Sequence, residues 1–79
     1  MSERYRRLQK LLRRVSRRGT PEWLCLSAAQ LLEILDETYA GPNTASRRRM
    51  IERDLRQLVE EERVEVVSGT RRPRRYRAM

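Results

Sequence analysis

The first segment of the chain alternates apolar and basic residues with the period of an α-helix. Its apolar residues recur at intervals of three and four: Tyr5, Leu8, Leu11, Leu12 and Val15. Cations fall on the opposite side: Arg6, Lys10, Arg13 and Arg17. This pattern predicts an amphipathic helix over about residues 3–17. Ser2 can cap its start, and Gly19 followed by Pro21 supplies a stop.

A short apolar run and a second helical pattern follow. The run WLCL at residues 23–26 lies between a Gly-Thr-Pro turn and Ser27, which predicts one short strand. Ser27 and Gln30 have the spacing of a capping box, so a second helix is expected over about residues 28–39. Gly41 and Pro42 should end it, because proline disfavours helical geometry in the residue before it.

A third helix is predicted over about residues 47–61, within and beyond the stretch SRRRMIERDLRQL, with Ser46 or alternatively Thr44 as its cap. At 100° per residue, its aliphatic residues share one stripe that should be buried: Ile51, Leu55 and Leu58. Its arginines lie within a narrow arc on the far side: Arg49, Arg53 and Arg56. Such a helix suits the major groove, since the arginine fork can pair with guanine or clasp a phosphate.

The C-terminal segment has the pattern of a hairpin over about residues 64–77. Val64 and Val66 should face the core on the first strand, and Tyr76 should lie on the return strand. The tip carries cations and no acid, which suits a phosphate track or a narrow minor groove: Arg71, Arg72 and Arg74. The alternative is a frayed basic tail. Pairing with the WLCL strand would supply the third strand that an isolated hairpin needs.

Helix, strand, helix, helix, hairpin is the element order of a winged helix-turn-helix, an α+β fold with three helices and a small antiparallel sheet. With 79 residues, the chain is expected to form one such domain over residues 1–79. The chain has no histidine and a single cysteine, Cys25, which we expect to be buried and unreactive. An enzyme, a metal site and a cofactor are therefore not expected.

The charge distribution gives information about the binding partner, because the formal net charge is +8 and the charges are unevenly distributed along the chain. Residues 1–18 carry eight basic and one acidic side chain, residues 19–40 carry four acidic and none basic, and residues 46–58 carry five basic and two acidic. This alternation favours a folded positive face, whose usual partner is nucleic acid. A solvated surface is the alternative interpretation.

The third helix also resembles a known family. The stretch SRRRMIERDLRQLVEEERVEVV is similar to the recognition helix and wing entry of bacterial DeoR-type regulators, most of all the DNA-binding domains ahead of WYL domains. The matching positions are Arg48, Arg49, Ile51, Arg53, Asp54, Leu55 and Leu58. The resemblance implies DNA contacts by Arg48, Arg49, Met50, Glu52 and Arg53, and a structural pairing for Asp54. Met50 stands where the family usually has threonine, and Glu62 where a glycine usually ends the helix.

The resulting hypothesis is a sequence-specific regulator of transcription that acts as a repressor on double-stranded DNA, from a bacterium or a phage. Arg49, Arg53 and Arg56 would read bases, while Arg47, Arg48, the wing arginines and parts of the first helix would hold phosphates. We expect a homodimer, with contacts from the first helix, Met50 or Trp23, located in the cytoplasm with the nucleoid. No membrane association and no small-molecule ligand is inferred. A winged-helix adaptor or inhibitor that binds an acidic protein, and an RNA-binding winged helix, remain as alternatives.

Overall fold

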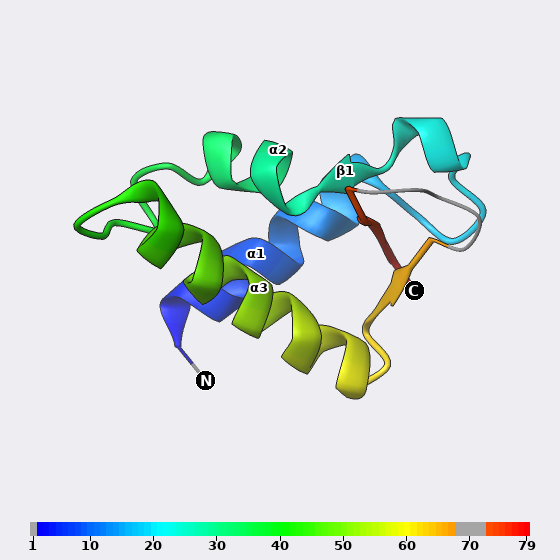
Figure 1. The fold of residues 1–79 in the computed structure, drawn as a ribbon. Coiled ribbons are helices and arrows are strands. Elements are labelled where there is room, and N and C mark those ends of the chain that lie inside the picture. The colour runs from blue at the N-terminus through cyan, green and yellow to red at the C-terminus, as the bar shows by residue number, and fades with distance from the viewer. Residues whose placement is uncertain (1, 68–72) are drawn as a thin grey trace.

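The computed structural model describes residues 2–67 and 73–79 of the chain (Figure 1). The elements follow in the order α1 (Glu3–Val15), the 3-10 turn η1 (Glu22–Leu24), β1 (Leu26–Ser27), α2 (Ala28–Ile34), α3 (Thr44–Glu60), β2 (Val64–Val66) and β3 (Arg75–Ala78). The protein is therefore α+β, with three helices and a small three-stranded antiparallel sheet. Within the described part of the chain, every helix is too short or too polar to cross a membrane.

α1 crosses behind α3, and the side that it turns inward is apolar, as its periodicity predicted (Figure 1). Leu8 and Leu12 are fully buried and pack with Ile51, Leu55 and Leu58 of α3. Ser2 caps α1 by accepting a 3.2 Å hydrogen bond from the backbone N–H of Tyr5, which confirms the predicted start. The helix ends at Val15, two residues earlier than predicted, because Ser16 adopts an extended backbone.

α2 begins as predicted but ends five residues early. The Ser27 hydroxyl accepts from the Gln30 N–H and the Gln30 amide oxygen accepts from the Ser27 N–H, which confirms the capping box. The predicted end at residue 39 is wrong, because the chain turns after Ile34: the N–H groups of Thr38 and Tyr39 both donate to the Leu35 carbonyl. This turn places the side chain of Tyr39 in the core, where it is fully buried.

α3 begins earlier than predicted, since Asn43 rather than Ser46 or Thr44 is its cap. The Asn43 side-chain oxygen accepts a 2.8 Å hydrogen bond from the Ser46 N–H. At the other end Glu62 adopts the left-handed conformation, with φ of 58°. The N–H of Arg63 donates to Leu58 O at 2.9 Å and that of Glu62 to Val59 O at 3.0 Å, which together form a Schellman motif.

The sheet has the strand order β1-β3-β2, with both pairs antiparallel. The predicted strand at 23–26 is wrong in its position: residues 22–24 form the 3-10 turn η1, and β1 comprises only Leu26 and Ser27. Val64 is buried as expected, whereas Val66, at the end of β2 that leads into the hairpin loop, is 38% exposed instead of facing the core. Tyr76 lies on the return strand, opposite both Leu26 and Val66, as the predicted three-stranded arrangement requires.

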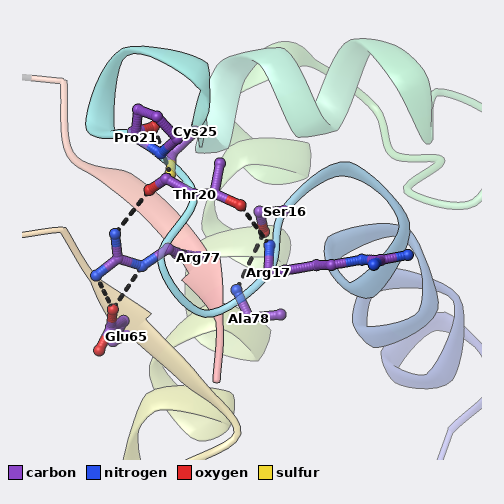
Figure 2. Close-up of polar contacts among 8 residues, drawn as sticks. All are labelled: Ser16, Arg17, Thr20, Pro21, Cys25, Glu65, Arg77 and Ala78. Atoms are coloured by element: carbon purple, nitrogen blue, oxygen red, sulfur yellow. Dashed lines mark hydrogen bonds and ion pairs between the residues drawn. The ribbon is translucent and has the colours of Figure 1, made fainter.

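Hydrogen bonds and one ion pair connect β3 to the segment between α1 and β1 and to β2 (Figure 2). We call this set of contacts, made by Ser16 and Arg77, the clasp. The Ser16 hydroxyl donates to Leu12 O at 2.9 Å and accepts from the Ala78 N–H at 3.1 Å. Arg77 donates to Thr20 O at 2.7 Å and forms an ion pair with Glu65 of β2. Because β3 is the central strand, the clasp holds the hairpin against the helices.

Candidate nucleic-acid interface

Three arginines project from the side of α3 that faces away from the core. Arg49, Arg53 and Arg56 are exposed, and the inward residues of the same helix include the fully buried Ile51 and Leu55. Within the described residues, none of the three guanidinium groups forms a hydrogen bond or an ion pair. The helix therefore presents three cations with free donors, at the spacing i, i+4, i+7.

The opposite side of α3 is anchored by a buried carboxylate. Asp54 is only 4% exposed and accepts from the Arg4 guanidinium of α1 at 2.8 Å and 3.2 Å. The Tyr39 hydroxyl donates to the same carboxylate at 2.6 Å, and the Arg4 guanidinium lies 5.5 Å from the Tyr39 ring centroid. The pairing of Asp54 that the family resemblance implied is thus present, with partners from α1 and from the turn after α2.

The pKa values of these partners follow from their surroundings. The hydrogen bond to Asp54 raises the pKa of Arg4, so its positive charge is retained at any physiological pH. Burial, and then the hydrogen bond to Asp54, raises the pKa of Tyr39. Tyr39 therefore remains a neutral donor to the carboxylate, and the three side chains form one satisfied network.

A second anchor joins α1 to the end of α3. The hydroxyl of the buried Tyr5 donates to the Glu61 carboxylate. Burial, reinforced by this hydrogen bond, raises the pKa of Tyr5 to about 12. The same bond lowers the pKa of Glu61. α3 is consequently held to α1 near its middle, through Asp54, and at its C-terminal end.

Arg47 has partners within the chain, in contrast to the predicted phosphate contact. Its Nε donates to Tyr39 O at 2.7 Å, and its guanidinium forms an ion pair with Asp36. A methyl group on Gly41 would lie 3.1 Å from Cγ of Arg47, so glycine permits the close approach of the turn to this side chain. Arg47 therefore fixes the turn before α3, and we assign it an anchoring role.

A groove of about 640 Å³ separates α3 from the β2–β3 hairpin. Its floor includes Ala28, Val59 and Tyr76, and its rim carries charges of both signs: Arg48, Glu52, Arg56, Glu60 and Arg74. Arg48 donates to Glu52 at 3.1 Å, an i,i+4 pair with both side chains half exposed. The structure thus brings together Arg48, Glu52, Arg56 and Arg74 of the predicted site.

The remaining predicted site residues lie elsewhere. Met50 is partly buried and packs against the core, on the flank of α3 rather than at the centre of its exposed side. Arg71 and Arg72 lie outside the described residues. Two other wing arginines bind the chain's own backbone: Arg75 donates to Trp23 O at 3.1 Å, and Arg77 belongs to the clasp.

The sequence reasoning missed Arg4 and Tyr39 as partners of Asp54. Arg4 is one of eight basic residues at positions 1–18, and the charge count does not distinguish it from the others. The distinguishing signal is its spacing: Arg4 lies four residues before Leu8 and seven before Leu11, which places it on the same side of the helix as these apolar residues. The predicted second helix over residues 28–39 includes Tyr39 as its last residue, because the periodicity gives no sign that the helix ends at Ile34.

Comparisons of the chain with protein-family models, with curated proteins and with solved structures found no match.

Proposed function

We propose that the protein is a winged helix-turn-helix domain that binds double-stranded DNA in a sequence-dependent way and represses transcription by occupying an operator. α3 would enter the major groove, with Arg49 and Arg53 at base edges. Arg56 and Arg74, which line the groove between α3 and the hairpin, would hold the phosphate backbone at its edge.

One observation carries this proposal: α3 is held to the rest of the domain on one side, while the outward arginines on its other side have no hydrogen-bond or ion-pair partner among the described residues. The Asp54 network fixes the rotation of the helix about its axis, so the guanidinium groups of Arg49 and Arg53 point outward into solvent.

Selection of bound sequences from a random duplex pool tests the proposal. We expect one enriched motif whose half-site spacing reports the symmetry of the complex. If about six phosphates are neutralised, the logarithm of affinity should fall with the logarithm of salt concentration at a slope of about −5. A pool without enrichment, together with a slope near zero, would refute DNA recognition by this surface.

Exposed apolar residues on η1 support an accompanying homodimer. Trp23 is 72% exposed and Leu24 is 49% exposed, which is unusual for a tryptophan in a small domain. Helix-turn-helix proteins commonly bind paired half-sites as dimers, and aromatic residues are enriched in protein interfaces. The same pair also supports the second candidate function, an adaptor for another protein, which would form a tight protein complex while enriching no DNA motif.

A further inference from the structure

The outer side of α1 carries a second set of unpaired cations. Arg6, Lys10 and Arg14 follow the spacing i, i+4, i+8, which keeps them within an arc of about 80°. We call these three residues the α1 outer face. All three are exposed, and among the described residues none of their side chains forms a hydrogen bond or an ion pair. Glu3 is the one acid of residues 1–18, and it is already paired with Arg7 at 2.9 Å.

The α1 outer face points away from the exposed side of α3. α1 turns Arg4 and Tyr5 toward α3, where they bind Asp54 and Glu61. The outer face lies on the opposite side of the α1 cylinder. On α3, at 100° per residue, Arg49 and Arg56 lie about 140° and 160° around the helix from Asp54, whereas Arg53 lies on the flank and shares a pocket with Ser2 and Arg4. The two helices overlap in Figure 1, with α3 in front. Together with the helical positions, this arrangement puts the α1 outer face and the side of α3 with Arg49 and Arg56 on opposite sides of the helix pair.

Distance makes the two faces electrostatically independent. The domain measures 35 × 26 × 20 Å along its principal axes. Two packed helices, with axes about 8–10 Å apart and side chains reaching about 5–6 Å beyond each axis, are about 20 Å across, which is more than twice the Debye length of about 8 Å at physiological ionic strength. A duplex bound to α3 would therefore leave the α1 outer face uncompensated, and phosphates of that duplex would not neutralise it.

The chemistry of the α1 outer face favours one kind of occupant. Its length of about 12 Å, at 1.5 Å per residue, corresponds to two or three successive phosphates of one DNA strand, which lie about 7 Å apart along the strand. It presents no aromatic side chain on which unpaired bases could stack, which disfavours single-stranded nucleic acid. The apolar side of α1 is buried in the core, so the helix has no surface with which to enter a lipid bilayer. A second copy of the same face would be repelled by like charge.

We propose that the α1 outer face binds the phosphate backbone of a second DNA duplex, so that a single domain bridges two duplexes. The inference rests on the proposed function of α3 for the first duplex. The second contact is sequence-independent, because phosphates carry no base information. Bridging should weaken with salt more steeply than binding of one duplex, by an additional slope of about −3 for three phosphates.

A capture assay with two duplexes tests this. One duplex with the selected motif is fixed on beads, the protein is added, and a labelled duplex of unrelated sequence is offered in solution. The wild-type protein should retain the labelled duplex. The triple variant Arg6→Gln, Lys10→Gln, Arg14→Gln should retain at least about tenfold less, while its affinity for the bead-bound motif changes by less than about threefold. Thermal unfolding confirms that the variant is folded.

The matched control, Arg49→Gln with Arg53→Gln and Arg56→Gln, separates the two proposals. If α3 reads DNA, this control loses preference for the motif but still binds one duplex weakly through α1. If the control keeps the preference of the wild type, the proposed function of α3 fails, whatever the bridging result.

Three outcomes would overturn the bridging proposal. In the first, the wild-type protein retains no labelled duplex, or the α1 variant retains as much labelled duplex as the wild type. The latter result is expected of a dimer that binds one duplex with each of its two α3 helices. In the second, the α1 variant loses the bead-bound motif as strongly as the α3 control, which would place both faces on one duplex. In the third, retention that depends on α1 appears only when the labelled duplex is replaced by structured RNA or by vesicles of anionic lipid.

Discussion

Asp54 is the residue on which the orientation of α3 depends most. It is a buried carboxylate held by one cation and one hydroxyl from two other elements. Buried ion pairs add little relative to an apolar replacement, but removing one partner leaves the other unsatisfied. The network is therefore better understood as a device that specifies helix rotation than as a source of net stability.

The substitution Asp54→Asn should lower the free energy of unfolding by about 2–3 kcal/mol, because Arg4 loses its counter-charge and Tyr39 its charged acceptor. Arg4 is about one-third exposed, which limits the loss. Urea unfolding followed by circular dichroism measures it. The control is Asp36→Asn, which breaks the exposed ion pair with Arg47 and should cost less than about 1 kcal/mol. Equal losses in the two variants would contradict the anchoring role of Asp54.

Tyr5 should make the stability of the fold depend on pH at the alkaline end. Its pKa is near 10 when exposed and about 12 in the folded protein. Between these values the folded state keeps a proton that the unfolded state releases, so the free energy of unfolding falls as pH rises through this window. Tyr5→Phe should flatten this fall without abolishing it, since burial also raises the pKa of Tyr76.

The hydrogen bond between Tyr5 and Glu61 should also make the free energy of unfolding depend on pH in the acidic range. Because the hydroxyl lowers the pKa of Glu61, the bond stabilises the fold above the ordinary glutamate pKa and its contribution is lost as pH falls through the lowered value. Tyr5→Phe should reduce this acid dependence as well. Unfolding curves of both proteins across the pH range provide the measurement, and identical pH profiles would show that the hydroxyl makes no such bond.

At the scale of elements, α3 ends at a residue with a strained backbone, and a single substitution can relieve the strain. Glu62 holds the left-handed position of the Schellman motif, where a side chain is strained and glycine is not. Glu62→Gly should raise the free energy of unfolding by about 0.5–1 kcal/mol, which is the strain relieved minus the added entropy of the unfolded chain.

Glu60→Gly, two residues earlier in the last turn of α3, is the matched control. Here the backbone is helical, so glycine should destabilise by about 0.5–1 kcal/mol. The opposite signs of the two effects, measured by thermal or urea unfolding, are the test. A destabilising Glu62→Gly would mean that the carboxylate side chain makes a contribution that outweighs the strain.

Elements whose signal is local were predictable from the sequence, and elements that depend on distant contacts were not. The Ser27 capping box and the Ser2 cap involve neighbours three residues apart, so their residues alone indicate them. The left-handed Glu62 stands at the position where, in the family that the helix resembles, a glycine usually ends it. The early end of α2 was missed because it serves the burial of Tyr39 against Asp54, fifteen residues further along the chain. The start of α3 was misplaced because three candidate caps follow one another at residues 43–46.

The same distinction holds for the candidate site. The outward arc of Arg49, Arg53 and Arg56 follows from helical periodicity and is present in the structure. Arg47 and Arg49 lie two positions apart and look equivalent in the sequence, yet their different angles on the helix give Arg47 a buried carbonyl partner and leave Arg49 in solvent. Charge counts cannot separate an anchoring arginine from one that is free to bind DNA.

At the scale of the whole molecule, the exposed aromatic side chain on η1 makes the oligomeric state testable. If Trp23 and Leu24 form a homodimer contact, sedimentation of the wild-type protein should show a concentration-dependent dimer, and Trp23→Ser should shift it to monomer. Val66→Ser, at another exposed apolar position, is the control and should leave the dimer intact. A single monomer species at every concentration would remove the dimer proposal.

The most direct test of the central claim is the affinity of Arg53→Ala for the selected duplex, for each of its single base-pair substitutions and for a scrambled duplex. A base-reading role predicts a loss of about 1–3 kcal/mol on the selected duplex, with discrimination abolished at one position and little change on the scrambled duplex. Arg74→Ala, on the hairpin, should instead weaken binding to all duplexes alike. Equal losses for Arg53→Ala on selected and scrambled duplexes would contradict the claim that the outward side of α3 reads DNA.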